Sequence, residues 1–173
     1  KIASFENTDH ILLKKVARTF KPIIMSIGVA ELEEIDESVK ILRENGCSDL
    51  TLLKCTSTYP ASPKDSNIET LNLLSKVFNC KVGLSDHTLG IGVSVGAVAL
   101  GAQVIEKHLT LDRSDGGVDS QFSLEPHEFK QLVVECNNVY QALGGSFKMS
   151  EKEKMNMKFK RSLWVVKDIQ EGE

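Results

Sequence analysis

Short apolar segments alternate with longer, mostly amphipathic segments along this chain. The short segments are rich in Ile, Leu and Val and predict buried strands at residues 1–4, 22–26, 50–54, 82–84 and 104–106. The longer segments predict helices at residues 10–18, 31–44, 68–78, 91–101 and 126–143. A regular alternation of strands and helices is typical of an α/β fold with parallel strands.

Two neighbouring predicted strands are followed by histidines, His87 and His108. The helix predicted between them makes the strands parallel, so their carboxyl ends lie at the same edge of the sheet. Active sites of α/β proteins are built at this edge, and two converging imidazoles could form half of a metal site. Asp86 and Glu106 either fix the imidazole tautomers or are solvated or paired charges.

Polar or small residues end every predicted strand, which is the pattern of a (βα)8 barrel. Five strands therefore predict the C-terminal part of a TIM barrel, about five βα units, with an open doubly wound sheet as the alternative. Because a strand-end serine often only caps the next helix, the hydroxyls alone do not establish a binding site. We expect the barrel part at residues 1–145, a charged linker at 146–160, and a second domain beginning with a strand at 161–166.

Composition and charge narrow the classes of partner. The 173 residues carry a net charge of −3 without a Lys/Arg block, so a nucleic-acid partner is not expected. The longest weakly polar run is too short to cross a bilayer, so a membrane partner is not expected either. The four cysteines form no CxxC pair, which favours free thiols in a reducing, cytoplasmic compartment.

Several motifs, in order along nearly the whole chain, resemble the sialic acid synthase family. They are Lys1–Glu6, Leu53–Pro60, Gly83–Thr88, Val104–His108, Gly116–Asp119, Phe122–Pro126 and Arg161–Ile169. The second and sixth of these segments are most similar to the pseudaminate synthase branch. Ser57 stands where the neuraminate branch usually has Asn, which weakens assignment to that branch.

The resemblance implies a fold and a reaction. The fold is a (βα)8 barrel followed by a small antifreeze-like (SAF) domain, whose first strand would lie in 161–173. The reaction joins phosphoenolpyruvate to the open-chain aldehyde of an N-acetylated amino sugar, giving a nonulosonic acid and phosphate. Family members are homodimers in which the antifreeze-like domain covers the partner's site.

Individual roles also follow from the resemblance. A divalent metal, typically Mn²⁺, would be held by His87 and His108, which with the acidic residue Glu6 are the candidate catalytic residues. The positions that match phosphoenolpyruvate contacts are Lys1, Ser4, Ser26, Ser57 and Ser85. Tyr59 and Asp119 match positions that contact the amino sugar.

Three alternatives remain open at this point. The sugar could be that of an N-acetylneuraminate or a legionaminate synthase. The second and third alternatives concern the class of protein.

The chain opens within a predicted strand, so we expect a fragment that is inactive and prone to aggregate by itself. It could instead be a truncated, inactive copy acting only as an interaction module. A metal hydrolase could use the same histidine pair, but it would need a third ligand and a general base such as Glu6.

Overall fold

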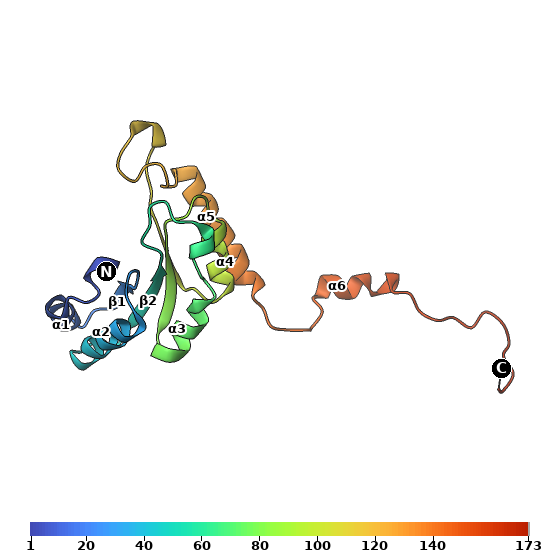
Figure 1. Ribbon diagram of the computed structural model, residues 1–173. Coiled ribbons are helices and arrows are strands. Elements are labelled where there is room, and N and C mark those ends of the chain that lie inside the picture. The colour runs from blue at the N-terminus through green and yellow to red at the C-terminus, as the bar shows by residue number, and fades with distance from the viewer. Residues whose placement is uncertain (173) are drawn as a thin grey trace. The chain divides into compact units, whose positions relative to one another are not determined.

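A four-stranded parallel sheet is the centre of the fold in the computed structural model, which describes residues 1–172. The strands are β1 (Ile23–Ser26), β2 (Leu50–Cys55), β3 (Lys81–Asp86) and β4 (Val104–Lys107). The helices of this part are α1 (His10–Ala17), α2 (Leu32–Glu44), α3 (Thr70–Phe78), α4 (Gly92–Ala99) and α5 (Pro126–Ala142) (Figure 1). Each strand pairs in parallel with the next one along the chain, which confirms the predicted βα alternation.

The two faces of the sheet differ in character, because successive strand residues point to opposite sides. Right-handed crossovers place the connecting helices on one face, where the buried core forms. The strand residues of this core are Ile23, Met25, Leu50, Leu52, Val82 and Leu84. The alternate positions face the other side, and several of them are polar: Ser26, Cys55, Ser85 and Glu106. The sheet therefore has an apolar outer face and a partly polar inner face, as in a barrel wall.

The first predicted strand is reduced to a single bridge, so the expected count of five strands was wrong. The backbone N–H of Ile2 donates to Ile24 at 2.8 Å, and the Ile2 carbonyl accepts from Ser26 at 3.0 Å. The chain then turns into a short 3-10 helix at Ser4–Glu6, closed by a hydrogen bond from the Glu6 N–H to the Ala3 carbonyl. This turn ends the pairing with β1.

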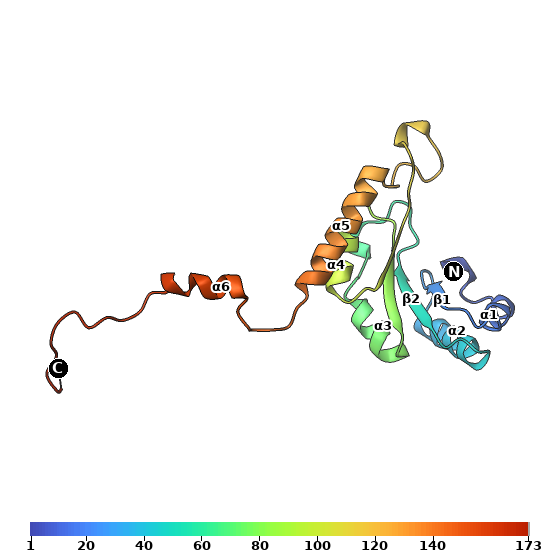
Figure 2. The same ribbon diagram turned by 180° about the vertical axis from the view of Figure 1, so that it is seen from behind.

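The segment between β4 and α5 projects beyond the sheet as a loop, drawn in yellow in Figures 1 and 2. Its two ends are joined by a bridge between Leu109 and Leu124. Arg113 ties the loop to the first turn of α5 through an ion pair with Glu128. Pro126 is the first residue of α5, as predicted, because a helix tolerates proline where no N–H is needed.

Residues 144–172 form a separate unit. It contains α6 (Glu151–Met155) and a 3-10 helix at Asn156–Phe159. The strand predicted at 161–166 was wrong, because these residues have no regular secondary structure. Within 144–172 there is no second strand with which this apolar run could pair, and Leu163 and Trp164 are exposed. Among the described residues, no helix has the length and apolar character needed to cross a membrane.

Candidate functional site

The histidines that follow β3 and β4 lie next to each other, as the strand pairing predicts. The ring centroids of His87 and His108 are 5.2 Å apart. The backbone of each is anchored to a neighbouring loop. The His87 carbonyl accepts from the Ala61 N–H at 2.9 Å, and the His108 carbonyl accepts from the Leu124 N–H at 2.9 Å. The loops that follow β2 and β4 are thereby held over the histidine pair.

Each imidazole is oriented through its Nδ1 atom. Nδ1 of His87 lies 3.0 Å from the Thr56 carbonyl oxygen, and Nδ1 of His108 lies 3.3 Å from Oδ2 of Asp119. Both partners are acceptors, so they place the proton on Nδ1 and leave the lone pair on Nε2. Thr56 and Asp119 thus do what the sequence suggested for Asp86 and Glu106.

Asp86 and Glu106 are paired charges, which was the other alternative left open by the sequence. Asp86 is buried and bound to Lys107 at 2.9 Å. Glu106 accepts from Lys1 at 3.0 Å and from the Ser85 hydroxyl at 2.7 Å. Burial raises the pKa of Asp86, but hydrogen bonds from Ser94 and Thr88 outweigh it and hold the pKa below its usual range.

The two imidazoles have pKa values shifted in opposite directions. Burial lowers the pKa of His108, and the nearby charge of His87 lowers it further. Burial also lowers the pKa of His87, but contacts with the Cys55 thiol and the Thr56 carbonyl outweigh it and raise the pKa. The thiol of Cys55 lies 4.0 Å from Nδ1 of His87. Burial raises the Cys55 pKa, while hydrogen bonds with His87, Ser4 and Ser57 bring it down to about 7.

Two aromatic rings pack against the histidines. The ring centroid of Tyr59 is 4.4 Å from that of His87, and the ring of Phe122 is 5.0 Å from His108. Phe122 is buried, whereas Tyr59 is 48% exposed, so Tyr59 is accessible to a ligand. Phe122 could not be assigned a place at the site from the sequence, because its contact with His108 depends on how the loop after β4 folds back.

Hydroxyl groups line the inner face beside the histidines. The Ser4 hydroxyl accepts from the Gly28 N–H at 3.1 Å, and the Ser57 hydroxyl lies 3.6 Å from the Cys55 thiol. Among residues 1–172, the Ser26 hydroxyl is the buried side-chain polar atom without a hydrogen-bond partner. Because such an atom costs free energy unless a ligand or water satisfies it, Ser26 marks a place where a polar ligand would bind.

The close packing of this hydroxyl cluster depends on Gly28. A Cβ atom at Gly28 would lie 2.2 Å from the Ser57 hydroxyl and 2.8 Å from the Ser4 hydroxyl. No larger residue could occupy this position without displacing both side chains. The sequence did not single out Gly28, since its role follows from the approach of three separate segments.

The structure brings most of the predicted site residues together. Lys1 and Ser85 both contact Glu106 at the end of β4. Tyr59 contacts His87, and Asp119 contacts His108. Glu6 is placed differently: its exposed carboxylate accepts from the Ala3 N–H at 3.0 Å. Among the described residues it has no recorded contact with either histidine.

The histidine pair suits a divalent metal with open coordination positions. Two imidazoles, each oriented through Nδ1 and each presenting Nε2, are a donor set for such an ion in their neutral form. Within residues 1–172, no group of three or more His, Cys, Asp or Glu side chains could hold a metal. A metal at His87 and His108 would therefore keep positions for water or substrate, as catalytic sites do and closed structural sites do not.

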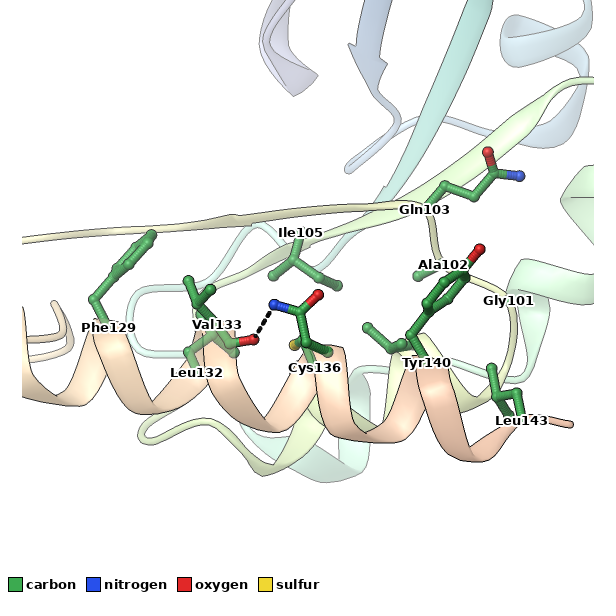
Figure 3. Close-up of a pocket in the computed structure, with 12 residues that line it drawn as sticks. Gly101, Ala102, Gln103, Ile105, Phe129, Leu132, Val133, Cys136, Tyr140 and Leu143 are labelled. Atoms are coloured by element: carbon green, nitrogen blue, oxygen red, sulfur yellow. Dashed lines mark hydrogen bonds between the residues drawn. The ribbon is translucent and has the colours of Figure 1, made fainter. Parts of the chain in front are cut away.

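A hollow of about 800 Å³ lies elsewhere, between α5 and the segment that enters β4. Figure 3 shows Phe129, Leu132 and Tyr140 projecting from α5 toward Ala102 and Ile105. Its lining is mainly apolar and contains no ionisable cluster. Catalytic chemistry is therefore better supported at the histidines than in this hollow.

Comparison with known proteins agrees with the geometry. The family model for the NeuB family matches residues 1–148. This chain belongs to the NeuB family. The sialic acid synthase resemblance inferred from the motifs is thereby confirmed.

Relatives of this NeuB-family chain include named synthases. Pseudaminic acid synthase of Campylobacter jejuni is 46% identical over 100% of this chain and 51% of the relative. N,N'-diacetyllegionaminic acid synthase of the same species is 45% identical over 100% of this chain and 53% of the relative. The chain thus spans about half the length of these relatives.

A solved structure shows the same fold. N-acetylneuraminic acid synthetase of Leptospira borgpetersenii matches with a TM-score of 0.83 and 34% identity, covering 91% of this chain and 55% of that one. This match confirms the parallel βα half-barrel.

The contact between Cys55 and His87 gives a test of the site's electrostatics. Removing the thiol by Cys55→Ala takes away the contact that most raises the His87 pKa, so that pKa should fall. The His87 titration followed by NMR should therefore move toward lower pH. Cys136→Ala, which removes a thiol on α5, should leave it in place. An unchanged or raised His87 pKa in Cys55→Ala would contradict this description.

Proposed function

We propose that the complete protein condenses phosphoenolpyruvate with the open-chain aldehyde of an N-acetylated amino sugar. A carbon–carbon bond forms between C3 of phosphoenolpyruvate and the aldehyde carbon, water adds at C2, and phosphate leaves. The product is a nonulosonic acid. The observation that carries this proposal is the His87–His108 pair beside a cluster of hydroxyls, with no hydrogen bond or ion pair to either Nε2 atom from residues 1–172.

The hydroxyl cluster supports an anion site for phosphoenolpyruvate. Ser26 has a buried, unpartnered hydroxyl, and Ser4, Ser57 and Ser85 lie on nearby segments. Lys1 adds a positive charge, held toward the site by Glu106. Hydroxyl and ammonium donors are suited to phosphate and carboxylate oxygens, and bonds to such charged groups are stronger than neutral ones.

The metal expected at His87 and His108 would supply Lewis acidity toward the sugar aldehyde, and Mn²⁺ is our proposal for it. The chain's own residues prepare that site. The Thr56 carbonyl and the Asp119 carboxylate hold a proton at each Nδ1, so that Nε2 remains available. Tyr59 packs against the ring of His87, and Phe122 packs against the ring of His108.

The amino sugar is proposed to lie over Tyr59 and Asp119, which flank the metal position. Asp119 is half exposed, so it can meet a ligand while it contacts His108. Glu6 remains a proposed acidic residue of the site, although its carboxylate is engaged locally by the Ala3 N–H. We also propose that the complete protein is a cytoplasmic homodimer with an antifreeze-like domain.

Pseudaminic acid synthase is our preferred member, with a legionaminic or N-acetylneuraminic acid synthase as the alternative. Identities of 46% and 45% to the first two types do not separate them. The preference therefore rests on Ser57 and on the segments around it and around Phe122. A hydrolase is less well supported, because within residues 1–172 no third metal-binding side chain joins the histidines.

The test measures the activity of the complete protein, purified with Mn²⁺. We expect sugar-dependent release of phosphate from phosphoenolpyruvate with 2,4-diacetamido-2,4,6-trideoxy-altrose, compared with its legionaminate counterpart and N-acetylmannosamine. His87→Ala should abolish release, because it removes one of the two metal-binding nitrogens. His127→Ala, at an exposed histidine of α5, should leave it unchanged.

Two results would contradict the proposal. One is a folded, metal-loaded protein that releases no phosphate with any of the three sugars, which would favour an inactive copy. The other is full activity in His87→Ala. The sugar that gives the highest kcat/KM identifies the member.

Because the Ser26 hydroxyl is unpartnered within residues 1–172, we expect Ser26→Ala to weaken substrate binding without lowering the stability of the protein. Ser26→Ala removes no hydrogen bond from the unliganded protein, so its thermal stability should be equal or slightly higher. The KM for phosphoenolpyruvate should rise about tenfold or more, since a hydrogen bond to a charged ligand is lost.

The matched control is Ser48→Ala, at an exposed serine before the opposite end of β2. It should change neither quantity. If Ser26→Ala kept the original KM, Ser26 would not contact the substrate.

A further inference from the structure

A buried ion pair joins the strand ends immediately before the two histidines. Asp86 and Lys107 are the last residues of β3 and β4 and are direct partners in the strand register. Their carboxylate and ammonium are 2.9 Å apart, and each side chain is 1% exposed. The charges therefore lie in the protein interior, one residue from His87 and from His108.

The pair faces away from the site. Strand residues alternate between faces, so Asp86 and Lys107 point toward the helices, whereas Ser85 and Glu106 point toward the inner face. The Ser94 hydroxyl of α4 confirms this direction by donating to Oδ2 of Asp86 at 2.6 Å. A substrate bound at the histidines would not contact these buried charges.

The same pair holds the residue after His87. Oδ1 of Asp86 accepts from the Thr88 N–H at 2.8 Å and from the Thr88 hydroxyl at 2.7 Å. The Lys107 ammonium also donates to the Thr88 carbonyl. Both neighbours of His87 are thus fixed to each other and to Lys107, which is the residue before His108.

Stability alone does not explain why charges lie here. Two buried charges lose their hydration, and replacing such a pair with uncharged side chains of similar size is often neutral or stabilising. The arrangement does, however, restrict the backbone on both sides of His87 and the spacing between the two strand ends. It can therefore set the relative position of the imidazoles, which pack at 5.2 Å.

We propose that Asp86 and Lys107 are positioning residues that hold His87 and His108 in the geometry required to share one metal ion. This inference rests on the proposed function for its metal, but the ring geometry that it concerns is a property of the metal-free protein. Neither residue contacts substrate or metal; both act through the two histidines.

The test uses the double variant Asp86→Asn/Lys107→Met in the complete protein. Asn keeps the size of Asp and an acceptor for Thr88, and Met keeps most of the volume of Lys. Removing both charges together avoids an uncompensated buried charge, so the double variant should fold with near-original thermal stability. Each single substitution leaves one buried charge unpaired and should be less stable than the double variant.

Two readouts follow on the folded double variant. In the metal-free protein, NMR signals of the His87 and His108 rings should shift, while those of His10 and His127 serve as internal references. Binding of Mn²⁺, measured by titration without substrates, should weaken tenfold or more, the loss typical of residues that orient metal ligands.

The outcomes separate this inference from the proposed function. If the NMR signals of the His87 and His108 rings are unchanged in the double variant, the positioning role is overturned, whatever its Mn²⁺ affinity. Original Mn²⁺ affinity would also overturn it, provided that His87→Ala has lost binding. If His87→Ala binds Mn²⁺ as before, the metal proposal fails, and the ring signals alone decide the role of the pair. If the double variant does not fold, the pair is required for folding itself, which also contradicts the inference.

Discussion

The parallel register of β3 and β4 is the constraint on which the candidate site depends. It aligns Ser85 with Glu106 and Asp86 with Lys107, and it therefore brings the histidines that follow side by side. Gly83 permits this close pairing, because a Cβ atom there would lie 2.3 Å from the Val104 carbonyl oxygen. A slip of one residue would turn the polar inner-face residues toward the helices and separate the imidazoles.

The difference between the apolar outer face and the polar inner face of the sheet follows from this register. Apolar residues on the outer face pack under the helices and provide the burial that stabilises the fold. The inner face is thereby free to carry hydroxyls, a carboxylate and imidazoles, which would be costly in an apolar core. Asp86 and Lys107 depart from this pattern, since they place charges on the apolar side and satisfy them by pairing.

Much of the fold and part of the site could be predicted from the sequence, because both follow from local patterns. Alternating apolar segments gave the strands, and the strand–helix–strand order placed His87 beside His108. The contacts made by Thr56 and Phe122 could not be predicted, since they depend on how loops fold back over the strand ends. The strand expected at 161–166 failed because an apolar run needs a partner strand, and residues 144–172 contain none.

Nε2 atoms of both strand-end histidines are proposed to share one metal ion. Anomalous diffraction from crystals of the complete protein with Mn²⁺ tests it most directly. One anomalous peak is expected at bonding distance, about 2.1 Å, from Nε2 of His87 and of His108. A peak that contacts Nδ1, only one of the two rings, or neither ring would contradict it.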